Sequence, residues 1–336
     1  MKQSTIYAII GTLAVLVILE GAWLYQTNVQ LGITNKQLDD SYSSQETLVK
    51  DVNAIVNQIN AYKSEVDQSM AWFQSNSILG SSSDAIAAKQ ALSNNCIQFS
   101  ENECKIKAGC LFLVNSKLLN LEYIKDYLVS DKVDKLQSVE DFLKHGGGDC
   151  EDYSLFYKAE YNYMLKQCTD KGYTVNIESW RRDLDNTDKY WLNFDESWYV
   201  MEAEAVGLPL GSTYPVIVCG TMYNQIDDKT EGHCVVSFTA KKITDEDDIL
   251  TQLDKAPLVE PQNGIYIGEI NSGTSGTYLL TAENYKDKPD KIIYLVITDT
   301  DLFKFNEDRA EWISYSSFSY QLKEQSQEIS SKVPSV

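Results

Sequence analysis

The chain has 336 residues, 49 of them acidic and 29 basic, which gives a formal net charge of −20. A hydrophobic content of 43% and 21 tyrosines exclude global disorder and allow a sizeable core. Nucleic acid is excluded as a partner because phosphate binding needs a basic face. The acidity itself is typical of a soluble, self-repelling surface.

The N-terminus predicts a membrane anchor over residues 1–26. An uncharged run covers residues 3–19, and with the following GAWLY it reaches the length that spans a bilayer. A cleaved signal peptide is the alternative, but its small-residue site after Ala22 has Glu20 at the −3 position. Lys2 precedes the run and no base follows until Lys36, so we expect a single-pass protein with a cytoplasmic N-terminus and an extracytoplasmic bulk.

Residues 27–79 are predicted to form a helical coiled-coil stalk. Apolar residues recur at alternating steps of four and three, at Leu48, Val52, Ile55, Ile59, Tyr62, Val66 and Phe73. This pattern indicates homo-oligomerisation or docking on a partner helix through residues 38–73. An amphipathic helix that packs on its own domain explains it equally well.

The cysteine count indicates disulfide bonds in an oxidising compartment. The chain has seven cysteines, an odd number, so at least one thiol is left unpaired, and Cys150 is the candidate for it. The three cysteines between residues 96 and 110 fit no zinc spacing and have no histidine nearby, so we assign no metal and no cofactor. The candidates for disulfide bonds are Cys96, Cys104, Cys110, Cys168, Cys219 and Cys234.

The rest of the chain predicts an α+β fold, with helices first and strands later. A mostly helical leader covers residues 84–145, and a second helix runs from Cys150 to about Cys168. Residues 176–213 carry no clear pattern, and a polar tail is expected over residues 301–336. Short β-branched and aromatic runs predict strands at 214–223, 233–240, 264–270 and 291–298, the first two forming a hairpin that a Cys219–Cys234 disulfide would cross.

The stretch HGGGDCEDYSLF, residues 145–156, has the features of a nucleophile site. A cysteine in the first turn of a helix meets unsatisfied N–H groups and the positive end of the helix dipole, which favour its thiolate. Glycines up to Gly148 permit a close approach of backbone. Asp149, the expected N-cap, acts with Glu151 and Asp152 to raise the pKa of the thiol, so Cys150 needs a base.

Two further residues complete the predicted site. His233 opens a predicted strand, where a fixed imidazole facing a cysteine gives the geometry of thiol hydrolases. Glu269 shares a face with Ile265 and Ile267, and a carboxylate on an otherwise apolar strand face needs a partner. We therefore predict Cys150 as nucleophile, His233 as base and Glu269 as the group that orients the imidazole, with Gly148, Asp149 and Asp152 supporting them.

These motifs resemble those of the bacterial and archaeal transglutaminase-like cysteine peptidases. GGGDCEDYSLFYKAEY is similar to their GDCED(Y)A signature, GHCVVSF to their histidine motif, and IYIGEINSG more weakly to their acidic motif. The resemblance covers about residues 138–270 and implies a papain-like core at 138–298, within a domain at 80–300, in which the cysteine helix packs on an antiparallel sheet. It also implies Cys150, His233 and Glu269 in the roles given above. Cys234 replaces the usual small residue after the histidine.

The sequence supports two functions. The first is a membrane-anchored thiol hydrolase that cleaves peptide or amide bonds of a protein or peptide substrate through an acyl-enzyme, or that cross-links proteins by transfer to a lysine amine. The second is a catalytically inactive module of the same fold, tethered by its stalk for binding or assembly. The state of Cys150, free and acidic or paired and inert, distinguishes them.

Overall fold

The computed structural model describes the backbone of residues 3–128, 135–181, 189–194, 197–202, 204–208, 213–224, 229–272, 278–282, 293–306 and 308–332. The chain divides into two compact units. One contains residues 1–64 and 321–336, and the other contains residues 65–320.

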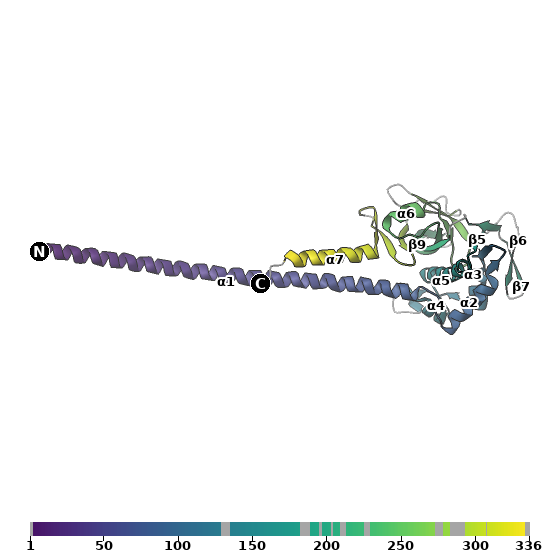
Figure 1. The fold of residues 1–336 in the computed structure, drawn as a ribbon, viewed down its shortest axis with the longest axis horizontal. Coiled ribbons are helices and arrows are strands. Elements are labelled where there is room, and N and C mark those ends of the chain that lie inside the picture. The colour runs from purple at the N-terminus through teal and green to yellow at the C-terminus, as the bar shows by residue number, and fades with distance from the viewer. Residues whose placement is uncertain are drawn as a thin grey trace. The chain divides into compact units, whose positions relative to one another are not determined.

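The first unit is made of two helices. Helix α1 (Gln3–Asn76) begins in this unit and continues into the next, and α7 (Tyr315–Lys332) ends in it. The two helices lie side by side, and Ser326 Oγ on α7 donates a hydrogen bond of 2.8 Å to Asn60 Oδ1 on α1 (Figure 1). Val56 on α1 and Leu322 on α7 are buried.

Among the residues whose side chains are described, no helix is both long enough and apolar enough to cross a membrane. The membrane anchor is predicted at residues 1–26. The side chains of residues 1–22 lie outside the described part of the structure.

The second unit is built on an antiparallel sheet, in which the described residues form eight strands in the order β13-β12-β11-β10-β9-β14-β15-β16. The hairpin of β9 and β10 lies at its centre and is held by an uninterrupted ladder from Tyr214↔Thr239 to Asn224↔Lys229. The strands are β9 (Tyr214–Asn224), β10 (Lys229–Thr239), β11 (Pro257–Val259), β12 (Tyr266–Ser272), β13 (Tyr278–Ala282), β14 (Ile293–Ile297), β15 (Leu302–Asn306) and β16 (Glu311–Ser314).

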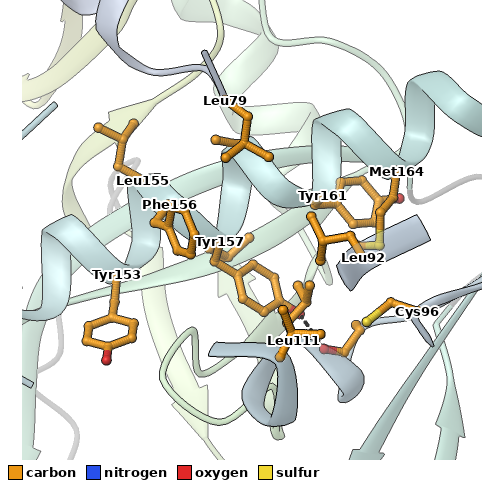
Figure 2. Close-up of a cluster of buried hydrophobic side chains, with 14 of the residues drawn as sticks. Leu79, Leu92, Cys96, Leu111, Tyr153, Leu155, Phe156, Tyr157, Tyr161 and Met164 are labelled. Carbon is orange, nitrogen blue, oxygen red and sulfur yellow. Dashed lines mark hydrogen bonds between the residues drawn. The ribbon is translucent and has the colours of Figure 1, made fainter. Parts of the chain in front are cut away.

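One face of this sheet carries the helix that begins at the candidate nucleophile. Helix α5 (Cys150–Thr169) packs against β9 and β10, and α2 (Ser83–Asn95) and α4 (Val139–His145) pack against α5. Tyr161 of α5 meets Phe238 of β10 edge to face, with ring centroids 4.8 Å apart. Figure 2 shows the aromatic and aliphatic side chains of α5 directed into this core, which burial of apolar surface stabilises.

The opposite face of the sheet has its own core. Strand alternation places Val235 and Leu258 on this face, where α6 (Glu246–Gln252) contributes the fully buried Ile249. Phe303 and Trp312, on β15 and β16, are also buried here. Residues 301–336 therefore supply two strands and a helix in place of the expected polar tail.

A second, four-stranded sheet joins the N-terminal part of this unit to the segment that follows α5. Its order is β1 (Ile97–Phe99), β2 (Glu103–Lys107), β5 (Thr174–Arg181) and β8 (Glu204–Gly207), with β2 and β5 parallel. Smaller elements are α3 (Cys110–Leu113), the π-turn Val114–Leu118, β3 (Glu122–Tyr123), the 3₁₀ turn Asp126–Leu128, β4 (Gly147–Gly148), β6 (Lys189–Phe194) and β7 (Ser197–Glu202).

The fold is thus the predicted α+β type, with a cysteine-bearing helix packed on an antiparallel sheet. The four predicted strands correspond to β9, β10, β12 and β14 within a few residues.

Candidate active site

The turn before Cys150 is built on glycines. Helix α4 ends at Gly146, which has a φ of 78°, and the chain then enters β4, which pairs in parallel with β3. Gly147 has a φ of 140°, and a Cβ on it would lie 1.8 Å from the carbonyl oxygen of Glu122. Only glycine fits there, so this residue serves the close pairing of two backbone segments that fixes where α5 begins.

Asp152 anchors the first turn of α5 from the inside. Its side chain is buried, and it accepts hydrogen bonds from the backbone N–H of Gln137 at 2.7 Å and from Gln137 Nε2 at 2.5 Å. Burial raises the pKa of Asp152 to about 6, against the opposing effect of the Gln137 hydrogen bonds. The same glutamine holds His145, whose Nδ1 lies 2.6 Å from Gln137 Oε1. His145 and Asp152 therefore belong to a positioning network for the helix start.

The thiol of Cys150 is half-buried and contacts both its own helix and the sheet. Cys150 Sγ donates to Glu151 Oε2 at 3.2 Å, and it accepts a hydrogen bond from the backbone N–H of Cys234 on β10. Burial, reinforced by the charge of Glu151, holds the pKa of the Cys150 thiol well above its ordinary value. The sequence predicted that the helix start would favour the thiolate and that the nearby carboxylates would favour the thiol. In the structure, the effects that favour the protonated thiol are the larger ones.

Three carboxylates converge beside the nucleophile. Oxygen atoms of Asp126, Asp149 and Glu151 lie within 4.8 Å of one another. Asp149 occupies the predicted N-cap position of α5 without a capping hydrogen bond from its side chain. Burial, followed by the hydrogen bond to Asp149, raises the pKa of Glu151 to about 9, so Glu151 keeps its proton near neutral pH. Carboxylate oxygens are the donors that hard divalent cations bind, but such a cluster alone does not assign an ion.

The imidazole of His233 is held by a carboxylate that the sequence did not single out. His233 Nε2 lies 2.8 Å from Glu260 Oε2, and both side chains are about one-fifth exposed. Glu260 follows β11 directly, and Val259 pairs with Val236, so the chain leaves this strand towards the His233 end of β10.

Glu269, the predicted orienting acid, lies elsewhere. It is exposed on β12 and pairs with Pro257, at the opposite end of β11 from Glu260. Strand β11 separates β12 from β10, so Glu269 is two strands away from the histidine strand. A signal for Glu260 was present in the sequence, since it is a lone carboxylate at the end of the apolar run PLV and is followed by Pro261.

All seven cysteines lie in the described part of the chain, where six form three disulfides and Cys150 is free, as predicted. The bridge across the central hairpin joins Cys219 to Cys234, which face each other directly in the ladder with Cα atoms 4.1 Å apart. Such a short separation marks a non-hydrogen-bonded pair, whose N–H groups point away from the partner strand. The Cys234 N–H is therefore directed away from β9, and Cys150 receives it. The other two bridges join Cys96 to Cys110 and Cys104 to Cys168.

No protein-family model matches the chain, and no curated protein matches it. Among solved structures, Legionella pneumophila LapG matches at 11% identity over 81% of this chain and 96% of that chain, with a TM-score of 0.27. Its EGTA-treated form matches at 13% identity over 82% and 97%, with a TM-score of 0.27. Its calcium-bound form matches at 15% identity over 58% and 66%, with a TM-score of 0.25. TM-scores this low establish neither a shared family nor a shared chemistry.

Proposed function

We propose that the chain is a thiol hydrolase that cleaves peptide or amide bonds, with Cys150 as nucleophile, His233 as base and Glu260 as the residue that orients the imidazole. One observation carries this proposal. The single free cysteine of the described chain starts a helix and accepts the N–H of Cys234, and the neighbouring residue in the strand is a histidine fixed by a carboxylate. These are the residue types of an activated nucleophile, and the proposal requires that the His233 imidazole reach Cys150 Sγ.

The proposed reaction uses each ring nitrogen of His233 for one purpose. Glu260 engages Nε2 and stabilises the imidazolium, and Nδ1 takes the proton from Cys150 as sulfur attacks the substrate carbonyl. The backbone N–H groups at the start of α5 stabilise the oxyanion. The imidazolium then protonates the leaving amine, which yields a thioester that is released by water or by a lysine amine.

The protonated thiol favours a second candidate function, an inactive module of the same fold. A nucleophile whose pKa is raised by burial and by Glu151 reacts slowly until a base removes its proton. In this alternative, Cys150 is a buried structural thiol and the domain binds or assembles with partners.

An ester-hydrolysis assay on the full chain separates these candidates. With p-nitrophenyl acetate, we expect a burst stoichiometric with the chain, followed by turnover. C150S removes both phases. H233A reduces the rate by about 10²–10⁴-fold, the usual contribution of a general base.

The two glutamates form a matched pair for the same assay. E260Q is expected to slow turnover through loss of the imidazole orientation, whereas E269Q leaves it unchanged because Glu269 is exposed on β12. If C150S retains the burst, or if E269Q and E260Q lose equal activity, the proposed triad is wrong.

The three disulfides indicate that the protein folds in an oxidising compartment. We propose that residues 1–26 anchor it there as a single-pass membrane protein, on the basis of the uncharged run at residues 3–19. We also propose that residues 38–73 associate with a second copy. Leu48, Ile55 and Tyr62, three of the heptad residues, are 63%, 49% and 53% exposed on α1.

A further inference from the structure

A thiol lies next to a disulfide at the candidate site. Cys150 Sγ and Cys234 Sγ lie within 4.8 Å of each other, and Cys234 is bonded to Cys219. The backbone N–H of Cys234 also donates a hydrogen bond to Cys150 Sγ, and this hydrogen bond keeps the thiol beside Cys234. No part of the proposed hydrolytic reaction uses the disulfide.

We propose that Cys150 and the Cys219–Cys234 bridge form a thiol–disulfide exchange switch, in which Cys150 replaces Cys219 as the partner of Cys234. The Cys150 thiolate attacks Cys234 Sγ, the Cys150–Cys234 bond forms, and the Cys219–Cys234 bond breaks with its electron pair leaving on Cys219. Cys150 releases one proton to solvent when its thiolate forms, and the Cys219 thiolate takes up one proton when it leaves, so the net number of bound protons is unchanged. The number of thiols and disulfides is unchanged, so the step needs no oxidant or reductant.

The geometry selects Cys234 as the sulfur that is attacked. Cys234 belongs to the close group of Cys150 and Glu151, and its strand position puts its amide on the side of β10 that faces Cys150. Cys219 lies on β9, across the ladder, where it is the leaving sulfur. Both bridge residues are buried, so external thiols have poor access and the neighbouring Cys150 is the favoured attacking group.

The exchanged form has a defined consequence for the site. Cys150 is then bonded to β10 and has no thiol, so the nucleophile is stored in a reversible inactive form. This inference goes beyond the proposed hydrolase and does not depend on it, because it concerns the connectivity of three cysteines.

Two variants of the full chain test the proximity, and each removes the same native bridge. After incubation with oxidised glutathione and peptide mapping by mass spectrometry, C219S is expected to contain a Cys150–Cys234 disulfide. C234S is the matched control, and it is expected to leave Cys150 and Cys219 unlinked. Circular dichroism of both variants verifies that they fold. Failure of folded C219S to form the link, or equal linking in C234S, overturns the proposal.

The exchange itself is tested in the wild-type chain without added thiol. After incubation, acid quenching and alkylation in denaturant, a fraction of molecules is expected to carry the label on Cys219, and C150S is expected to lose that label. Absence of label on Cys219 in the wild type, or equal label in C150S, overturns the exchange. The ester assay is read separately, so loss of hydrolysis and loss of exchange are distinguishable.

Discussion

At the scale of single residues, the turn before Cys150 depends on a glycine that no side chain can replace. Gly147 combines a φ of 140° with a contact that would place a Cβ 1.8 Å from the Glu122 carbonyl oxygen. We expect G147A to lower the free energy of unfolding by about 3–4 kcal/mol, because backbone must move to accept the methyl group. Urea unfolding followed by circular dichroism measures this loss.

Gly172 provides the control for this substitution. It also has a positive φ, of 73°, but apart from its own and its two neighbouring residues no described atom lies within 4 Å of its Cβ position. G172A should therefore cost only the conformational strain, about 1–2 kcal/mol. Equal losses in the two variants would show that the contact with Glu122 has no effect on stability.

A buried lysine on α5 depends on one carboxylate. Lys158 is 1% exposed, and its Nζ is paired with Asp299, which Asn162 also contacts at 2.8 Å. Burial lowers the pKa of Lys158, and Asp299 opposes this effect. We expect D299A to cost about 2–3 kcal/mol, less than the ~3–5 kcal/mol for breaking a fully buried pair, because Asp299 is half-exposed. K158M should cost less, since it leaves no buried charge.

The loss in D299A should depend on pH in a definite direction. A lysine with a lowered pKa in the folded state binds fewer protons there than in the unfolded chain, so stability rises with pH between the two pKa values. The deficit of D299A should therefore shrink as the pH is raised from about 7 to about 10. Urea midpoints at several pH values measure it, and a deficit that grows with pH would contradict the assigned cause.

The site residues differ in how far the sequence could predict them. Cys150 and His233 stand in local motifs, and the odd cysteine count left Cys150 unpaired. Glu260 could not be assigned because its position beside His233 depends on the register between β10 and β11. The raised pKa of Cys150 also depends on burial, which follows from the packing of α5 on the sheet and not from spacing along the chain.

At the scale of elements, the heptad of α1 is shared between two surfaces. Of the heptad residues, the structure buries Val66 and Phe73 and leaves Leu48, Ile55 and Tyr62 exposed. Val56, which lies next to the heptad position Ile55, is also buried. The alternative of packing on its own chain is thus realised on one side of the helix. The sequence did not reveal α7 as a partner helix because polar residues, including Ser319 and Ser326, occupy buried positions along it.

The exposed side of α1 makes a prediction about association. Light scattering of the full chain in detergent, coupled to size-exclusion chromatography, should show a dimer. L48E/I55E/Y62E should be monomeric because charges at a helix interface are costly to bury. N57E/S64E alters two exposed positions outside these heptad positions and should remain dimeric. A monomeric wild-type chain would exclude this role for the exposed residues.

At the scale of the whole molecule, the three bridges enclose loops of different length. Cys104–Cys168 spans 64 residues, whereas Cys96–Cys110 spans 14. Since the longer loop restricts the unfolded chain more, C104S/C168S should lose about 4 kcal/mol and C96S/C110S about 3 kcal/mol. Guanidinium unfolding of both variants measures the difference, and the reverse order would point to effects in the folded state.

The general architecture was predictable because its signals are local. The helix after Cys150 and the strands at β9, β10, β12 and β14 each carry their own periodicity. The strands near the end of the chain could not be predicted, because the alternation of Phe303 and Phe305 extends over only a few residues of β15. Their burial follows from pairing with β14, a contact that short apolar runs do not specify.

The parallel pair of β2 and β5 has a consequence for the order in which the chain folds. The two strands flank α4 and α5 in the sequence, so their ladder forms only after this long connection has closed. Cys104 and Cys168 therefore meet late, whereas Cys96 and Cys110 are close along the chain and can be oxidised early. During that interval the thiols of Cys104, Cys150 and Cys168 are all reduced. Cys150 can then pair wrongly with either of the other two, so we expect a disulfide isomerase to speed the formation of the correct bridges.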